Sequence, residues 1–179
     1  MQIHLVLTVI GRDRPGLVSA VSETIAAFGG NWLDTRMASL SGQFAGMLLV
    51  AIAPEKADAL AASLRKLEAQ GLRFIIEKSD EPTPANGRTL RLELVGLDRP
   101  GIIRDISQVL AAQNVSIVEL ESERVSGSFS GEAMFKAKAR LTLPKGLRVE
   151  ELCRSLEALA SELMVDLLVD DNRPLVLCG

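Results

Sequence analysis

The sequence predicts an α+β protein that consists of two tandem copies of one βαββαβ unit. Two observations support this prediction: a four-residue motif occurs twice, and the spacing of apolar residues alternates between strand and helix in the same order around each occurrence. The motif Asp13-Arg14-Pro15-Gly16 recurs as Asp98-Arg99-Pro100-Gly101, 85 positions later. The same offset places Ser41-Gly42 on Ser126-Gly127, Phe44 on Phe129 and Gly46 on Gly131. We therefore expect a whole structural unit to be duplicated.

Each unit begins with a predicted strand that leads through the motif into a helix. Alternating apolar residues predict the strands at Ile3 to Ile10 and at Leu90 to Gly96. After each motif, apolar residues recur at helical spacing: Val18, Val21, Ile25 and Phe28 in the first copy, and Ile102, Ile106, Val109 and Leu110 in the second. The proline of each motif suits the first turn of a helix, and Gly29-Gly30 suits the end of the first one.

A hairpin, a second helix and a last strand complete each predicted unit. The hairpins pair Asn31–Leu40 with Gln43–Ala53, and Val115–Val125 with Ser128–Leu143. Leucines at helical spacing predict the second helices: Leu60, Leu64 and Leu67, then Leu152, Leu156, Leu159 and Leu163. The last strands are predicted at Arg73–Lys78 and Met164–Val169. This order of elements is the ferredoxin-like arrangement, in which both helices cover one face of an antiparallel sheet.

The boundary between the units is predicted where two prolines fall among polar residues, as in a short extended linker. We expect the first domain at residues 1–80, the linker at 81–87 and the second domain at 88–170. Residues 171–179 fit no part of the repeat and form a predicted C-terminal tail.

The composition is that of a packed globular protein, with 47% hydrophobic and 24% charged residues and a net charge of −3. His4 is the only histidine, no phosphate-binding glycine motif occurs, and Cys153 and Cys178 match neither metal-ligand nor disulfide spacing. We therefore expect no catalytic site, no metal and no cofactor. The excess of acidic over basic residues, 23 against 20, argues against direct nucleic-acid binding. The cysteine usage suits a reducing compartment, the N-terminus does not resemble an export signal, and no apolar segment is long enough to cross a membrane, so we expect a cytoplasmic protein.

The two motif loops are the candidate ligand sites. The start of a helix presents unpaired N–H groups and favours negative charge, so it suits a carboxylate. Gly16 and Gly101 leave room for a ligand there, and Asp13 and Asp98 suit an ammonium group, so an α-amino acid offers both matching charges. The alternative is structural, because aspartate before Pro-Gly is ordinary chemistry for a turn that opens a helix.

The motif loops, each followed by an apolar helix, a Gly-Gly-Asn or Gln-Asn turn and a Ser-Gly hairpin, resemble those of ACT domains, small regulatory modules that sense amino acids. A chain of two such domains is most similar to the glycine cleavage system transcriptional repressor family. This resemblance implies a small amino acid such as glycine or serine as effector, a transcription-regulator protein as partner, and a homodimer. It implies two ligand-binding sets: Asp13, Arg14, Gly16, Leu17 and Asn31, and Asp98, Arg99, Gly101, Ile102 and Asn114.

Asn31 aligns with Asn114 if the second copy has two extra residues, and an amide side chain both donates and accepts hydrogen bonds. Trp32 follows Asn31, so we expect its fluorescence to report ligand at the first site. We also expect Gly16→Val to crowd that site while leaving most of the core intact. Two functional alternatives stay open: a constitutive protein-interaction module that binds no metabolite, and a regulatory subunit of an amino-acid enzyme.

Charged residues alternate on two strands of the second unit. Glu119, Glu121 and Glu123 share one strand face, and Lys136, Lys138 and Arg140 recur at the same period on the next strand. Cross-strand pairs between them would contribute a few tenths of a kcal/mol each. We favour this interpretation over a docking surface for a basic partner.

Overall fold

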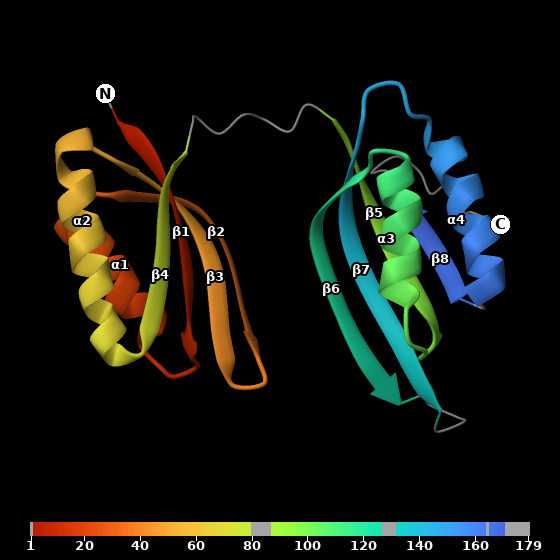
Figure 1. Cartoon of the computed structure of the whole chain (residues 1–179), viewed down its shortest axis with the longest axis horizontal. Coiled ribbons are helices and arrows are strands. Elements are labelled where there is room, and N and C mark those ends of the chain that lie inside the picture. The colour runs from red at the N-terminus through yellow and green to blue at the C-terminus, as the bar shows by residue number, and fades with distance from the viewer. Residues whose placement is uncertain (1, 80–86, 127–131, 164, 171–179) are drawn as a thin grey trace. The chain divides into compact units, whose positions relative to one another are not determined.

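Both halves of the chain have the ferredoxin-like βαββαβ architecture that the sequence predicts (Figure 1). The structure is a computed structural model that describes residues 2–79, 87–126, 132–163 and 165–170. It divides into two compact units, Met1–Pro84 and Ala85–Gly179. The predicted linker, apart from Gly87, and the predicted tail lie outside the described residues, so their bounds stay predictions.

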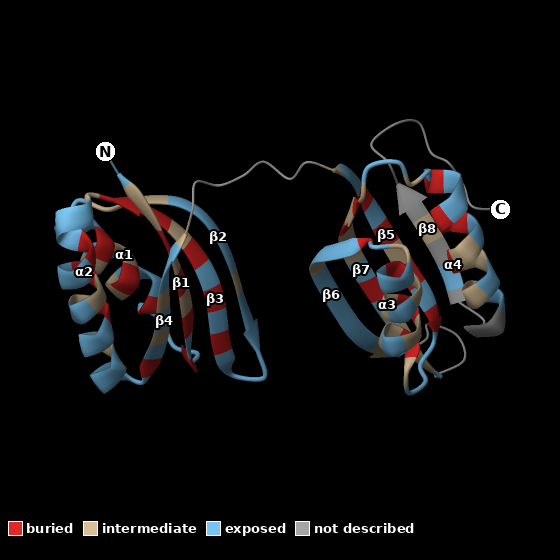
Figure 2. Ribbon diagram, turned by 45° about the horizontal axis from the view of Figure 1, so that its top comes forward, coloured by how far each residue is buried: buried red, intermediate tan, exposed pale blue. Residues whose placement is uncertain are grey.

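The first unit places two helices on one face of a four-stranded antiparallel sheet with strand order β2-β3-β1-β4. Its elements are β1 (Ile3–Arg12), α1 (Leu17–Ala27), β2 (Asn31–Leu40), β3 (Gln43–Ile52), α2 (Pro54–Lys66), the 3-10 helix η1 (Leu67–Gln70) and β4 (Leu72–Ser79). Alternation along β1 points Leu5, Leu7 and Val9 into the core under the helices. In Figure 2 the buried residues accordingly lie between sheet and helices.

The second unit repeats this arrangement with strand order β6-β7-β5-β8. Its elements are β5 (Arg88–Leu97), α3 (Ile102–Ala112), β6 (Ser116–Ser126), β7 (Ala133–Leu143), α4 (Val149–Leu163) and β8 (Val165–Asp170). The strand predicted from Ser128 is observed as β7 from Ala133; Glu132 is not part of it, and the predicted residues 128–131 lie outside the described part.

The hairpins of the two units are not related by the offset that relates their first strands. Gly11 of β1 pairs with Phe44, and Gly96, its counterpart in β5, pairs with Phe135. The structural equivalent of Phe44 is therefore Phe135, and the predicted match with Phe129 is wrong. By the same register Gly46 corresponds to Ala137 and not to Gly131. The second hairpin has a longer tip, which apolar periodicity cannot reveal.

The two asparagines of the candidate sites also occupy different positions. The left-handed residue after α1 is Gly29, with φ 71°, and the one after α3 is Asn114, with φ 55°. Asn114 thus corresponds to Gly29. Asparagine can occupy this position because it tolerates positive φ better than most side chains. Asn31 is instead the first residue of β2, as Ser116 is of β6, so the predicted alignment of Asn31 with Asn114 is wrong.

The cross-strand arrangement predicted for the charged residues of the second unit is confirmed by the register. Glu119 lies opposite Arg140, Glu121 opposite Lys138 and Glu123 opposite Lys136. The guanidinium of Arg140 binds both carboxylate oxygens of Glu119, at 2.6 and 3.0 Å. Lys138 also lies 3.5 Å from Glu93 on the other neighbouring strand. These charges are largely balanced within the sheet.

One position at the end of the first helix of each unit differs in polarity. Phe28 follows α1 and packs against the core of the first unit. Its counterpart Gln113 follows α3, and the Oε1 atom of Gln113 is buried without a hydrogen-bond partner in the described structure. An unpaired buried polar atom destabilises a fold.

We predict that Gln113→Leu stabilises the second unit by about 1 kcal/mol, because an unpaired buried polar group costs about 1–3 kcal/mol. Urea unfolding of the full chain, followed by circular dichroism, measures this change. The reciprocal substitution Phe28→Gln should destabilise the first unit by about 3 kcal/mol, since it removes packing and buries an amide. An unchanged unfolding midpoint for Gln113→Leu would show that the amide is solvated.

Candidate ligand-binding loops

The two motif loops connect the first strand of each unit to its first helix. Gly16 and Gly101 are the N-cap residues of α1 and α3, with φ of 89° and 95°. Positive φ explains the glycine, because a side chain is strained in this conformation. Neither cap supplies a side-chain hydrogen bond to its helix. Each loop therefore presents first-turn N–H groups that an external acceptor can use.

The motif aspartates hold each loop against its hairpin. The hydroxyl of Ser39 on β2 donates to the Asp13 carboxylate, and Arg124 Nε on β6 lies 2.8 Å from Asp98 Oδ2. The backbone N–H groups of Asp13 and Asp98 each donate to a hairpin carbonyl at 2.9 Å. These contacts account for both aspartates structurally. A role in binding an ammonium group stays a prediction.

The motif arginines have different partners in the two units. Arg14 Nη2 donates to the backbone oxygen and to the Oε1 of Gln70, at 3.0 and 3.2 Å, and so ties the first loop to the end of η1. In the second unit, Arg99 Nη2 lies 3.8 Å from Asp105 Oδ2. The two arginines thus contact different elements, η1 in the first unit and α3 in the second.

The first loop is open and the second is covered. A Cβ built at Gly16 would meet no described atom within 4 Å, whereas one built at Gly101 would lie 3.0 Å from Arg104 Nη2. The first turn of α1 has no acidic residue, but that of α3 contains Asp105, which is 2.7 Å from Arg104. The first loop is therefore better suited to an external carboxylate. This difference between the two loops is visible in the sequence, because Arg104-Asp105 occupies the positions that correspond to Ser19-Ala20.

The asparagines of the two predicted sets lie away from the motif loops. Asn31 pairs with Ala51, which pairs with His4 at the start of β1, whereas Asp13 follows the last residue of β1. Eight residues of strand separate the two ends by about 26 Å. Asn114 likewise follows the C-terminal end of α3, whose N-terminal end carries Gly101. Within one unit, the structure does not bring asparagine and loop together.

The remaining two residues of the sets are core residues. Leu17 and Ile102 are only 4% and 2% exposed, so a ligand at the loops would contact their backbone N–H groups. Trp32 lies beside Asn31, half-buried against the core of the first unit. It is therefore far from Gly16 of its own unit, and the expectation that its fluorescence reports ligand at the first site stays a prediction.

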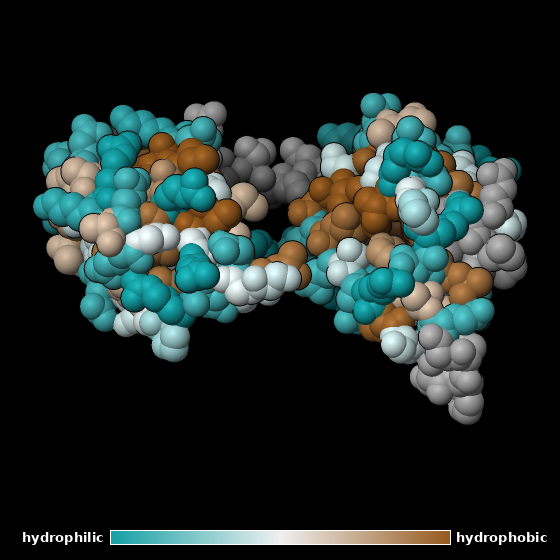
Figure 3. Space-filling model, turned by 60° about the horizontal axis from the view of Figure 1, so that its bottom comes forward, coloured by the Kyte–Doolittle hydropathy of each residue, from teal (hydrophilic) through white to brown (hydrophobic). Residues whose placement is uncertain are grey.

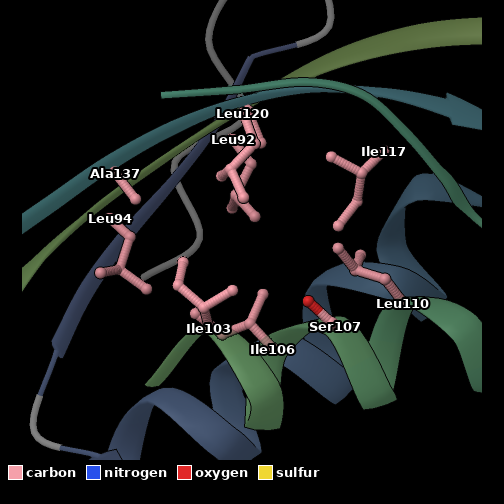
Figure 4. Close-up of a pocket in the computed structure, with 10 residues that line it drawn as sticks. Leu92, Leu94, Ile103, Ile106, Ser107, Leu110, Ile117, Leu120 and Ala137 are labelled. Carbon is pink, nitrogen blue, oxygen red and sulfur yellow. The ribbon is translucent and has the colours of Figure 1, made fainter. Parts of the chain in front are cut away.

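Apolar side chains reach the surface of both units (Figure 3). In the second unit a group of them surrounds a depression between α3 and the strands β5, β6 and β7 (Figure 4). Its volume is about 20 Å³, which is room for roughly one water molecule. Ser107 is its one polar lining residue. It cannot hold an amino acid, which needs partners for two charges. In the first unit Trp32 occupies the position of Ile117.

A family model for the ACT domain matches residues 3–77 and 88–170. The chain belongs to the ACT domain family. It is 24% identical over 165 residues to the glycine cleavage system transcriptional repressor of Escherichia coli (strain K12), a match that covers 90% of this chain and 86% of that protein. This ACT-domain chain is thus a regulatory protein related to that repressor, as its motif loops predicted.

Solved structures confirm the tandem ACT fold. An unknown protein from Galdieria sulphuraria has 27% sequence identity and a TM-score of 0.85, and the match covers 96% of this chain and 99% of that one. A candidate glycine cleavage system transcriptional repressor has 21% identity and a TM-score of 0.70, with 95% and 97% covered.

The described residues contain no cluster of three or more side chains that could hold a metal ion. Among their helices, none is both long and apolar enough to cross a membrane.

We predict that Gly16→Val destabilises the first ACT domain by about 1–2 kcal/mol, because valine is strained at positive φ. This loss of stability would add to the expected crowding of the ligand site. Gly16→Asn should lose less stability than Gly16→Ala, since asparagine tolerates the left-handed conformation. Chemical denaturation of each variant measures these differences.

Gly146→Val provides the matched control, because Gly146 also has a positive φ, 93°, and open space around it. A similar loss at both positions would identify backbone strain as the cause. Equal stability of Gly16→Val and the parent chain would contradict the conformation assigned to this loop.

Proposed function

We propose that this ACT-domain protein is a cytoplasmic amino-acid sensor that binds a small amino acid, such as glycine or serine, at the Gly16 loop. The observation that carries this proposal is the open, uncapped N-terminus of α1, which has no acidic residue in its first turn. A carboxylate there accepts hydrogen bonds from first-turn N–H groups and interacts favourably with the helix dipole.

The ammonium group of the ligand pairs with Asp13, whose carboxylate is exposed and held by Ser39. Each charge contact at an exposed helix end contributes about 0.3–1 kcal/mol, so the loop alone gives weak binding. The site therefore needs further polar groups. Asn31 and Asn114 do not supply them within their own units, because they lie too far from their own loops.

The regulatory output is contact with another protein. The related Escherichia coli protein is named a transcriptional repressor, and this chain has a net charge of −3, which does not favour direct DNA binding. We infer that two copies form a homodimer and that amino-acid binding changes its contact with a transcription regulator of glycine-cleavage-type metabolism. In this function the protein is not an enzyme.

A second function is favoured by the loop of the second domain. There, Arg104 lies over Gly101, Arg124 binds Asp98 and Arg99 lies 3.8 Å from Asp105, so three of the four motif residues contact side chains of their own unit. This supports a constitutive interaction module, or a regulatory subunit of an amino-acid enzyme, if the first loop also binds nothing.

We predict that the full chain binds one small amino acid in isothermal titration calorimetry against a panel that includes glycine and serine. Val18→Glu should weaken this binding about fivefold, because a carboxylate in the first turn of α1 satisfies the dipole internally. The same substitution should not destabilise the protein, since Val18 is 45% exposed.

Val18→Gln is the matched control, because it has nearly the same shape without the charge. Weaker binding by Val18→Glu alone would identify the helix terminus as the carboxylate site. Equal affinities for both variants would place the ligand elsewhere, and an absence of heat with every amino acid would favour the constitutive module.

A further inference from the structure

The helix-free face of the first sheet has an apolar centre and a mostly charged rim. Alternation turns Val6, Thr8 and Ile10 of β1, and Met47 and Leu49 of β3, away from the helices. Met47 is 55% exposed and Ile10 42%. The outer strands of the same face contribute Asp34 and Arg36 from β2, and Arg73, Ile75 and Glu77 from β4. An apolar centre with a polar rim is the usual anatomy of a protein interface.

The second sheet uses the same positions differently. The register makes Lys138 the counterpart of Met47, and Glu93 the counterpart of Thr8. These two residues form a 3.5 Å ion pair, and Arg140 at the position of Leu49 binds Glu119. On the outer face of the second sheet these charged side chains therefore pair with one another, and the face is suited to contact with solvent. Val95 and Leu97 are also exposed on this face, but charged residues occupy the positions that Met47 and Leu49 hold at the centre of the first sheet.

The rim of the first sheet is complementary to a second copy of itself. Along β4 the outward residues are Arg73, Ile75 and Glu77, so the two charges lie at equal distances on either side of Ile75. A two-fold axis that crosses the strands at Ile75 places Arg73 of one copy against Glu77 of the other, twice.

The same axis passes through the apolar centre, because Thr8 pairs with both Ile75 and Met47. Met47 then meets Met47 of the second copy, and Ile75, which is 62% exposed, meets its own counterpart. At the other edge Arg36 faces its own copy, with Asp34 2.7 Å away to balance the charge.

The size of the face is sufficient for a dimer. Strands β1, β2 and β3 have ten residues each and are roughly 33 Å long, and together with the eight-residue β4 they span roughly 19 Å, which gives about 600 Å² per copy. The total of roughly 1,200 Å² lies at the lower end of stable interfaces. Sheets that pack face to face do so with strands nearly aligned, which keeps the paired rows in register near the axis.

We propose that the helix-free face of the β2-β3-β1-β4 sheet is the homodimer interface, formed with a second copy about a two-fold axis at Thr8, Met47 and Ile75. This inference rests on the homodimer of the proposed function and gives it a surface. It is independent of the motif loop, which lies beyond the last residue of β1.

Sedimentation velocity of the full chain at micromolar concentration tests the interface. The parent chain should sediment as a dimer of 19.2 kDa subunits. Met47→Glu should abolish the dimer, because it buries two carboxylates on the axis. Val95→Glu is the control: Val95 is at the position of Ile10 on the second sheet, beside Lys136, and should leave the mass unchanged.

Charge reversal tests the geometry. Arg73→Glu and Glu77→Arg should each weaken the dimer about tenfold or more, since two like-charge contacts replace two opposite-charge ones. The double variant Arg73→Glu/Glu77→Arg should restore it, and circular dichroism verifies that each variant is folded.

A monomeric parent chain overturns both the homodimer and this interface, while leaving amino-acid binding to its own calorimetric test. A dimer that survives Met47→Glu overturns the interface alone. Loss of the dimer in both single charge variants without rescue in the double variant overturns the two-fold axis.

Discussion

The antiparallel pairing of the two central strands is the constraint on which each domain depends. In β1 with β3, and in β5 with β7, the pleat sends alternate side chains to opposite faces. The inner positions must be apolar in both domains because two helices cover them. The outer positions carry no such requirement, and there the copies diverge from Met47 to Lys138 and from Leu49 to Arg140. One backbone register thus supports one core and two different surfaces.

The motif loops show the same separation between what the fold requires and what a ligand would require. Left-handed glycine at the helix start is common to both domains, because the strand must turn into the helix within a few residues. The surrounding side chains are not common. Arg14 is drawn away to Gln70 in the first domain, while Arg104 lies over Gly101 in the second. Duplication kept the turn in both domains and an open helix terminus in the first.

The sequence predicted the order and nearly all of the elements because apolar periodicity is a local signal that the core imposes on each segment. The sequence-based alignment failed at the hairpin of the second domain, where the register makes Phe135 the structural equivalent of Phe44. The length of a loop leaves no periodic pattern in the sequence. The sequence analysis also placed Asn31 with the motif loop, although α1 and β1 separate them. The partners of the loops, Ser39, Gln70 and Arg124, were not predicted either. Those contacts join residues far apart in sequence, so only the folded chain shows them.

The proposed sensor function also requires a contact that the ligand changes, since binding shifts an equilibrium only through different affinity for two states. Asp13 offers such a contact. Its carboxylate accepts a hydrogen bond from Ser39, which lies on the same edge strand as Asp34 and Arg36 at the rim of the apolar face. An ammonium group bound to Asp13, as the proposal requires, would compete with Ser39 for that carboxylate and so weaken the contact between the loop and the β2–β3 hairpin. In the second domain Asp98 instead pairs with the guanidinium of Arg124 at 2.8 Å, so the two loops are joined to their hairpins by different groups.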